Sequence, residues 1–534
     1  MPFAPDLLNS LPAEVRAYIL ERELHIAERE LHIATLEQRI DVLEEQFRLA
    51  QLKRFAPSSE KHGLQGCLFN EAEASAQTAP ESTDDQPGCA DSADDTSTPG
   101  KKRGRKKLPA HLKRVRVEHD LPDAGKVCSC CQGALHRMGE DVTEQLHIVP
   151  AQVSVLQHVR FKYGCRHCEE HAIACHIVTS PMPAQPIPGS IASASTVATI
   201  LTAKYADGLP LYRMESVLER SEVEIGRGTM GRWVIRSSED WLARLYEMMR
   251  QTLLGQDVIH GDETPVQVLK EAGRTAQSTS YMWVYRSAEG SAQPVVLFDY
   301  QPGRGHEHPE RFLKGFAGAL MTDGYAAWRM LKGVTHLGCL AHARRRFDEA
   351  LKAQKQPTGR AKQALDYIGK LYQIEKKARG KPPEGETPEQ YTYRLRQEHS
   401  LGVLDTLYAW LVKNQKEVLP KSLIGKAIGY ALGQWKYLVR YIDNGRAPAD
   451  NNLLERDIRP FTTGRKAWLF SDTVAGAKAS AIIYSIMLTC RACNIEPYSY
   501  LRHVLTEMPQ RATGADMTDL LPFNYHPQPA SAID

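Results

Sequence analysis

The stretch Val258–Thr264, with the sequence VIHGDET, decides the fold of the central part of this chain. Its first residues are apolar and β-branched, which favours a strand, and they lead directly into Asp262. We therefore predict a short apolar strand that ends at this acidic residue and holds its carboxylate on rigid backbone, where a metal ion could bind. Taken alone, an Asp at such a position is more often a turn or cap residue.

Two further segments present acidic residues in a similar way. The run Gly318–Tyr325 (GALMTDGY) is small and apolar and delivers Asp323 to a glycine turn. The run Asp450–Pro460 (DNNLLERDIRP) reads as a helix that Asp450 caps and Pro460 ends, with Glu455 near its middle. Two carboxylates at strand ends and one on a helix suggest a single site.

Three carboxylates suit a hard divalent cation, because Mg²⁺ prefers oxygen ligands and is often bound through carboxylates and substrate phosphates. Two such ions about 3.5–4 Å apart can stabilise both the attacking and the leaving oxygen of a displacement at phosphorus. The chemistry implied is cleavage or transfer of phosphodiesters.

Several motifs, taken in order, resemble the insertion sequence 66 family of bacterial transposases. They are HGDET (260–264), TDGY (322–325), CLAHARRRF (339–347), NNLLERDIRP (451–460) and GRKAWLF (464–470). The resemblance covers nearly the whole chain, and the block around Glu455 is its most specific part. It implies an Asp-Asp-Glu transposase with a ribonuclease-H-like core, in which Asp262, Asp323 and Glu455 bind Mg²⁺ or Mn²⁺.

The composition is that of a soluble multidomain protein: 534 residues, 42% hydrophobic and 25% charged, with a net charge of +3. Met1–Asp6 lacks the features of a secretory signal, and the longest apolar run, 479–490, is too short to span a bilayer. The 11 cysteines include Cys-x-x-Cys pairs, which favour metal sites in a reducing compartment. We predict a cytoplasmic protein, and the family resemblance implies that it is bacterial.

The N-terminal segment, residues 1–55, is predicted to be a helix that forms a coiled coil and mediates oligomerisation. Apolar residues recur every seven positions in two rows, Ile26, Ile33, Ile40, Phe47 and Leu36, Leu43, Ala50. Arg29 interrupts the second row, so the coiled coil is expected to be short or to begin late. The alternative is a single amphipathic helix packed on the rest of the protein.

Residues 56–100 are predicted to be a flexible acidic linker, since few large apolar side chains occur there. A basic segment follows from Lys101. Its Arg103-Gly104-Arg105 core is slim enough to enter an A·T-rich minor groove, and the alternative is a basic tail that touches phosphates without sequence preference.

Residues 101–180 also contain two Cys-x-x-Cys pairs separated by a strand-like segment. The pairs, Cys128 with Cys131 and Cys165 with Cys168, have the spacing of a structural zinc ribbon with four thiolate ligands. Cys130 could replace one ligand, and His167 or Cys175 could do so less readily. We predict one structural Zn²⁺ here.

Residues 190–250 are predicted to form a helix-turn-helix region of three helices, at 193–205, 211–220 and 227–242. The third helix would carry Arg227, Arg232 and Arg236 toward a DNA groove. An ordinary helical connector would show the same periodicity.

The catalytic core is predicted at 256–353 and 444–495, with strands near 281–285, 294–299 and 334–337 and a basic helix at 341–353. The core is interrupted by an all-helical insertion at 354–443 and followed by a tail at 496–534. Cys339 and His342 have Cys-x-x-His spacing, but Arg344, Arg345 and Arg346 are better explained by a phosphate-facing helix. Arg465 and Lys466 could contact DNA beside Trp468, or Trp468 could lie in the core.

The fold class expected is therefore multidomain α/β: a coiled coil, a zinc ribbon, a helix-turn-helix region and a ribonuclease-H-like core with a helical insertion. The function expected is that of a transposase that binds the ends of its element, cleaves DNA and joins 3′-hydroxyl ends to target DNA. Its partners would be double-stranded DNA, further copies of the chain and small accessory proteins of the same element. The alternatives are a structure-specific nuclease that never joins ends, and an inert DNA-binding regulator. DNA contacts are expected from Arg103, Arg105, Arg227, Arg232, Arg344, Arg345, Arg465 and Lys466.

Overall fold

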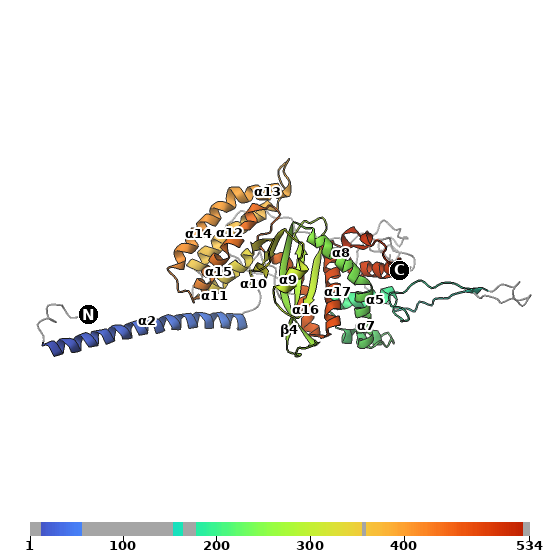
Figure 1. Cartoon of the computed structure of the whole chain (residues 1–534), viewed down its shortest axis with the longest axis horizontal. Coiled ribbons are helices and arrows are strands. Elements are labelled where there is room, and N and C mark those ends of the chain that lie inside the picture. The colour runs from blue at the N-terminus through green and yellow to red at the C-terminus, as the bar shows by residue number, and fades with distance from the viewer. Residues whose placement is uncertain (1–11, 56–152, 164–177, 355–358, 527–534) are drawn as a thin grey trace, which may run out of the picture. The chain divides into compact units, whose positions relative to one another are not determined.

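The computed structural model describes residues 12–55, 153–163, 178–354 and 359–526. The chain divides into two compact units, Met1–Pro57 with Arg160–Asp534, and Ser58–Val159. Of the second unit only residues 153–159 are described, and they form neither helix nor strand. The first unit is a mixed α/β structure with a central sheet (Figure 1).

The central sheet has five strands in the order β5-β4-β3-β6-β7. Strands β3, β4 and β5 are sequential and antiparallel, and β6 and β7 run parallel to β3. A short sixth strand, β8, pairs in parallel with the far end of β3. The bounds are β3 Val258–Lys270, β4 Thr279–Ser287, β5 Val296–Gln301, β6 Ala319–Thr322, β7 Thr335–Gly338 and β8 Ser471–Thr473; a separate pair is β1 Lys162–Tyr163 with β2 Val178–Thr179.

Strand β3 does not end at Asp262, as the sequence suggested. It continues to Lys270 because β4 pairs with it along most of its length, from Ile259 to Gln267. Alternation along β3 points His260 and Asp262 to one face of the sheet, and Gly261 and Glu263 to the other. Asp262 is therefore fixed by backbone on both sides of its position in the chain.

Helices cover both faces of the sheet and contribute to its largest hydrophobic core. Helix α17 also protects the edge strand β5. Its Ser485 and Thr489 hydroxyls accept hydrogen bonds from the backbone N–H groups of Phe298 (2.8 Å) and Val296 (3.0 Å), so this edge is closed to further strands. The helices around the sheet are α5 Ala194–Tyr205, α6 Leu211–Glu219, α7 Arg227–Ser237, α8 Ala243–Leu254, α9 Glu307–Phe312, α10 Ala326–Arg329, α16 Asn452–Trp468, α17 Val474–Ala492 and α18 Pro497–Glu507.

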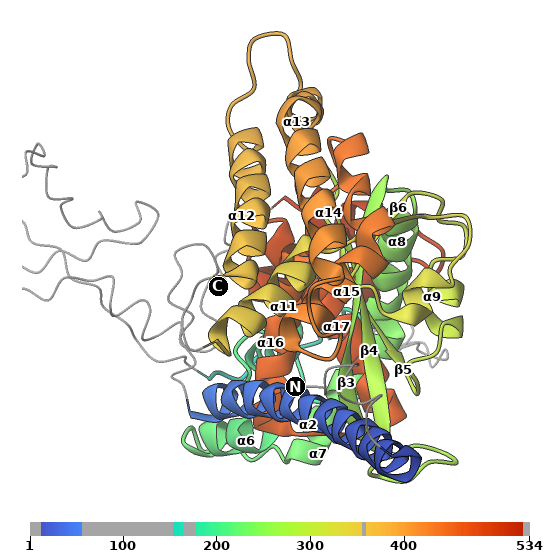
Figure 2. The ribbon, with the colours of Figure 1, turned by 90° about the vertical axis from the view of Figure 1, so that its left-hand side faces the viewer.

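Between β7 and α16 the described chain is helical, and the elements pack side by side in Figure 2. They have a small core of their own, which includes Phe347, Ile368 and Leu411. A buried ion pair between Arg396 and Glu375 (2.6 Å) ties two of these elements together. The bounds are α11 Leu340–Lys352, α12 Arg360–Ala378, α13 Pro388–Leu395, α14 Leu401–Gln415 and α15 Leu423–Leu438. Short helical turns occur at Ser238–Leu242, Arg396–Ser400, Arg440–Asp443, Met508–Gln510, Thr518–Leu520 and Pro522–Asn524.

The N-terminal helix α2 (Ala13–Phe55) has the helical conformation that its heptads predicted. Apolar residues of both rows are exposed along it, for example Ile33 (54%) and Leu43 (56%). Its C-terminal end contacts the helical segment: Arg48 Nε donates to Ala353 O (3.1 Å), and Glu45 accepts from the N–H of Leu423 (2.9 Å). Pairing with a second copy stays a prediction.

Helix α16 differs in two respects from the helix predicted around Glu455. It begins one residue later, because Asn451 is its N-cap residue and Asp450 lies outside it. It also continues through Pro460 to Trp468. Packing of Ile458 and Phe461 in the main core holds residues on both sides of the proline in place, which outweighs the lost backbone hydrogen bond.

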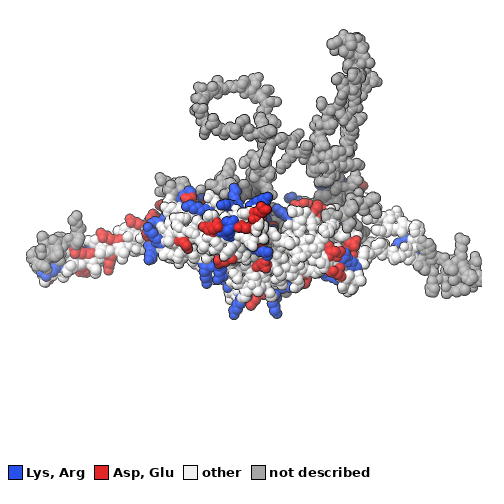
Figure 3. Space-filling view, turned by 90° about the horizontal axis from the view of Figure 1, so that it is seen from above, with Lys and Arg blue, Asp and Glu red and all other residues white. Residues whose placement is uncertain are grey.

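None of the helices in the described ranges is long and apolar enough to cross a membrane. On the face shown in Figure 3, Lys and Arg side chains lie among Asp and Glu side chains and do not form one continuous patch. Several predictions lie outside the described residues, namely those for the linker at 56–100, Arg103, Arg105, Cys128, Cys131, Cys165 and Cys168.

Candidate active site

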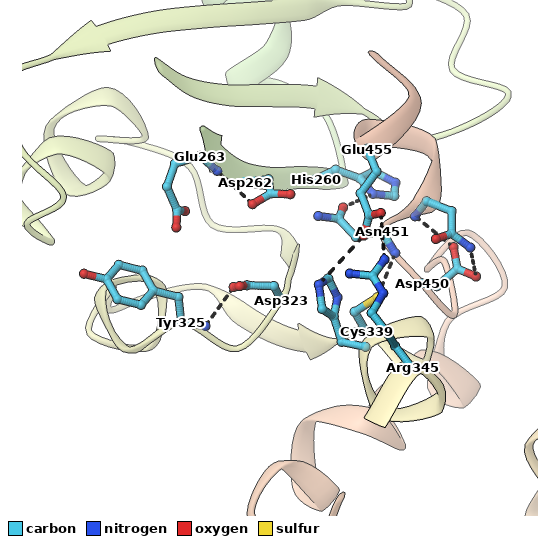
Figure 4. A network of polar contacts seen from close by, with 12 residues as sticks. His260, Asp262, Glu263, Asp323, Tyr325, Cys339, Arg345, Asp450, Asn451 and Glu455 are labelled. Atoms are coloured by element: carbon cyan, nitrogen blue, oxygen red, sulfur yellow. Dashed lines mark hydrogen bonds and ion pairs between the residues drawn. The ribbon is translucent and has the colours of Figure 1, made fainter. Parts of the chain in front are cut away.

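The register of the sheet brings Asp262 and Asp323 to neighbouring strands. In the parallel pair of β3 and β6, His260 aligns with Met321. The same offset two residues further aligns Asp262 with Asp323, which directly follows β6. Neighbouring strands lie about 4.7–4.9 Å apart, so the two residues sit side by side on one face. Figure 4 shows both side chains directed toward a common space.

Glu455 reaches the same space from the first turn of α16 (Figure 4). The N-cap residue Asn451 holds this end of the helix against the sheet. Its Oδ1 atom lies 2.8 Å from His260 Nδ1, and its Nδ2 donates to Gly261 O at 3.2 Å. Its backbone N–H donates to Cys339 Sγ at 3.2 Å. Asn451 is fully buried, so one side chain joins β3 to the start of the glutamate helix.

The hydrogen-bond partners of Asn451 determine which ring nitrogen of His260 carries the proton. Because Asn451 Nδ2 donates to Gly261, its Oδ1 accepts, and His260 Nδ1 must carry the proton. Burial lowers the pKa of His260 to about 4, and the bond to Asn451 opposes this only in part. The imidazole is therefore neutral at physiological pH and acts as a fixed support beneath Asp262.

The Glu455 carboxylate contacts two residues of helix α11. Its Oε2 lies 3.3 Å from Arg345 Nη2, and its Oε1 lies 3.8 Å from His342 Nε2. Oε1 is buried and makes no hydrogen bond. Burial lowers the pKa of His342, while the nearby Glu455 acts in the opposite direction. The neighbouring thiol of Cys339 is fully buried and accepts a hydrogen bond, so it serves packing at this point.

The environment of Asp262 disfavours its negative charge. Burial raises the pKa of Asp262 well above its ordinary value, and Glu263, Asp323 and Glu455 raise it further by repulsion. One oxygen, Oδ1, accepts the N–H of Glu263 at 2.8 Å. Asp323 Oδ1 likewise accepts the N–H of Tyr325 at 2.8 Å. Within the described residues, no three His, Cys, Asp or Glu side chains are already closed around a metal position.

On the opposite face of β3, Glu263 is a second buried carboxylate. It pairs with Arg304 and accepts a hydrogen bond from Trp328 Nε1 at 2.8 Å. The Arg304 guanidinium lies 3.8 Å from the centre of the Tyr325 ring. Trp328 also explains the glycine of the HGDET motif, since a Cβ on Gly261 would approach the indole ring to 2.7 Å.

The predicted DNA-contacting residues lie in different settings. Arg227 and Arg232 are exposed on α7, and Arg345 is exposed beside Glu455. Arg465 is turned inward instead, where it donates to Thr264 Oγ1 at 3.2 Å. Trp468 packs on Phe461 in an edge-on contact, which favours the structural alternative for this segment.

Sequence reasoning left out several residues that surround the carboxylates. Glu263, His260 and Asn451 stand next to predicted site residues in the chain, yet nothing in a local motif shows that Asn451 bonds to β3 across 191 positions. His342 was weighed only as a metal ligand with Cys339. Its contact with Glu455 depends on how α11 and α16 pack, which periodicity does not report.

Comparisons with known proteins identify the class. The model of the "Transposase IS66 family" matches residues 189–479, which is more than half of the chain and contains all three acidic residues. Three further models of that family match: the zinc-finger binding domain of transposase IS66 (126–169), the Transposase C of IS166 homeodomain (42–117) and the IS66 C-terminal element (485–523). The class of protein is therefore a transposase.

The chain is also similar to curated proteins from Sinorhizobium fredii (strain NBRC 101917 / NGR234). The uncharacterized protein y4jD is 31% identical over 434 residues, which cover 78% of this chain and 81% of the relative. The uncharacterized protein y4qI is 30% identical over 441 residues, covering 80% and 78%. The chain belongs to the IS66 family of transposases.

Proposed function

We propose that this protein is a DNA transposase of an insertion sequence, and that Asp262, Asp323 and Glu455 form its catalytic centre. The observation that supports this best is the convergence of two register-aligned aspartates and a helix-borne glutamate on one space. Three antiparallel strands followed by two parallel ones also have the order expected of a ribonuclease-H-like core. The helices at 360–443 are then an insertion in that core.

The acidic residues fit divalent cations such as Mg²⁺ or Mn²⁺. Asp262 is a carboxylate with repelling neighbours, and Glu455 has a buried oxygen without a hydrogen bond. Both features are relieved by a positive ion with oxygen ligands. When bound, two such ions supply an activated water and stabilise charge on the phosphate and leaving oxygen.

The residues of the chain itself have separate tasks in this proposal. Asn451 and His260 fix the angle at which α16 approaches β3, so that Glu455 faces the aspartates. Arg345, exposed next to the site, is positioned to bind a DNA phosphate. Glu263 anchors Arg304 against the ring of Tyr325, two residues after Asp323, and this cation would lie near the path of the DNA.

Other parts of the chain would bind and assemble the DNA complex. We propose that Cys128, Cys131, Cys165 and Cys168 hold a structural Zn²⁺ within the zinc-finger region, and that Arg103, Arg105, Arg227, Arg232 and Arg344 contact element ends. Helix α2 would join two copies of the chain, since its apolar rows are exposed. Small accessory proteins of the same element would be further partners. The protein would act on DNA in the bacterial cytoplasm.

The test uses a plasmid that carries this reading frame with its flanking genomic DNA. Purified wild-type protein with Mg²⁺ should cut the DNA at the element ends and join a pre-cleaved 3′ end to target DNA. Asp323→Asn should reduce both reactions by about 100-fold or more, on the scale of losing one transition-state contact. Asp299→Asn is the matched control, because Asp299 is a largely buried carboxylate of β5 outside the site.

The outcomes separate the alternatives. Cutting without joining of a pre-cleaved end would indicate a nuclease and not a transposase. Joining that persists in Asp323→Asn would refute the assignment of this residue. The wild type could also bind DNA but neither cut nor join it, with zinc and divalent ions present. That result would indicate an inert DNA-binding regulator.

A further inference from the structure

We propose that helices α10, α11 and α15, with the helical turn Arg440–Asp443 that follows α15, form a surface that binds the DNA strand leaving the acidic site. This arginine–tyrosine surface consists of four cations and two aromatic rings, namely Arg329, Arg346, Lys436, Arg440, Tyr430 and Tyr437. The inference rests on the proposed function, since it takes the ligand of the acidic site to be DNA. It gives the helical segment at 360–443 a definite task.

The surface begins at the acidic site itself. The Tyr430 hydroxyl on α15 donates a hydrogen bond to the backbone oxygen of Asp323 at 2.8 Å. The guanidinium carbon of Arg346 lies 4.2 Å from the centre of the Tyr430 ring. A phosphate bound by Arg346 would therefore lie close to one held at Asp323.

The surface continues along α15 to a second ring. Tyr437 has three cations around it: Arg329 at 3.9 Å, Lys436 at 4.8 Å and Arg440 at 5.5 Å from the ring centre. His336 lies edge-on to the same ring at 6.1 Å. Burial lowers the pKa of this histidine, and the same three cations lower it further. Positive charge is thus concentrated around one tyrosine.

Some other cations of the helical segment have carboxylate partners, which these four lack within the described residues. Elsewhere in the helical segment, Arg396 pairs with Glu375 and Arg360 with Glu417. Among the described residues, none of the four cations of the surface makes an ion pair within 4.0 Å of a carboxylate. The carboxylate acting on Arg329 is Asp323, a proposed metal ligand. Arg329 Nε is also buried without a hydrogen bond.

Like charges gathered in this way repel one another, and a polyanion would relieve that repulsion. Cations interleaved with aromatic rings are the arrangement that binds nucleic-acid backbone while bases stack. An acidic peptide would gain from the charges alone, whereas the tyrosine rings and the connection to Asp323 favour a DNA strand.

The experiment measures DNA binding by full-length protein without divalent cations, so that catalysis plays no part. The probe is a fluorescein-labelled linear DNA duplex of random sequence, and anisotropy gives Kd at several salt concentrations. The test variant combines Arg346→Gln, Lys436→Gln and Arg440→Gln. The matched control combines Lys413→Gln, Lys421→Gln and Lys426→Gln, which remove the same charge from exposed lysines of the same helical segment.

Each phosphate contact contributes about 0.9 to the slope of log K against log salt. In the test variant the magnitude of this slope should fall by about 2–3, and Kd should rise on the order of 10-fold or more. The control should keep both values near those of the wild type. An equal change of slope and Kd in the control and test variants, or no change in either, would refute the proposal that this surface binds DNA.

A second variant separates loss of DNA contacts from loss of a structural contact. Arg440 Nη1 donates to His336 O at 3.2 Å, so a variant with only Arg346→Gln and Lys436→Gln repeats the test without this contact. It should lose about 1–2 from the slope, and an unchanged slope would contradict the proposal. Failure of the wild type to bind DNA at all would instead refute the proposed function, and catalysis that persists in Asp323→Asn would refute only the assignment of that residue.

Discussion

Asn451→Ala is the substitution that best tests how the site is built. Removing this side chain would leave His260 Nδ1 and Gly261 O buried without the partners that now lie at 2.8 and 3.2 Å. Each unsatisfied buried group costs about 1–3 kcal/mol, so the free energy of unfolding should fall by about 2–6 kcal/mol. The loss of stability should be large because Asn451 is fully buried, so that water cannot take the place of its side chain as a hydrogen-bond partner.

The matched control is Asn452→Ala, one residue further along the chain. The Asn452 side chain is half-buried and donates to Asp450 Oδ2 at 3.0 Å, two residues earlier in the chain. Denaturant unfolding followed by tryptophan fluorescence measures both variants, since Trp283 and Trp328 are fully buried beside β3. If the two variants differ by less than about 1 kcal/mol, the bridge between β3 and α16 does not have the stabilising role assigned to it.

Three further predictions concern the same region. Gly261→Ala should destabilise the protein by about 1–3 kcal/mol, because a Cβ would lie 2.7 Å from the Trp328 ring; Gly369→Ala, a helical position with open space, should be neutral or stabilising in the same thermal unfolding assay. The raised pKa of Asp262 means that the folded protein without divalent ions loses stability as pH rises above the unfolded value of about 3.9. Asp262→Asn should therefore raise stability at neutral pH, and this advantage should shrink on acidification; an advantage that grows on acidification would contradict the prediction. Arg345→Gln should tighten Mn²⁺ binding to DNA-free protein by up to about 5-fold, because an exposed ion pair contributes up to about 1 kcal/mol; electron paramagnetic resonance titration measures it, and weaker binding would contradict the competing role of this arginine.

The strands of the core could be predicted from sequence because their apolar runs are short and bounded by turn residues. The segments around Trp283 and Val296 were expected as strands and are β4 and β5. The end of β3 was misjudged because Asp262, Glu263 and Thr264 are polar and Pro265 follows them. Pairing with β4 continues the strand there, and a polar pattern cannot show such pairing.

The acidic residues could be identified from local motifs, but their surroundings could not. A motif specifies a residue type at a position, whereas the partners of Glu455 come from a helix about one hundred residues earlier in the chain. The end of α16 was also misplaced, since Pro460 normally stops a helix. Tertiary packing of Phe461 on Phe298 and Tyr484 overrides that preference here.

The zinc ligands, the coiled-coil pairing and the DNA contacts remain predictions for different physical reasons. Cys128, Cys131, Cys165 and Cys168 lie outside the described residues. Helix α2 is present with its apolar rows exposed, but pairing requires a second copy of the chain. For Arg227 and Arg232, exposure allows DNA contact without identifying a groove.

The bridge from Asn451 to His260 also constrains when a growing chain could become active. The two residues are 191 positions apart, with the helices of the inserted segment between them. A ribosome must therefore complete α16 before the glutamate can meet the aspartates, and such long-range pairing is slow to form. If the proposed function holds, truncated products that stop within the inserted segment would carry both aspartates but not Glu455, and we expect them to cut no DNA.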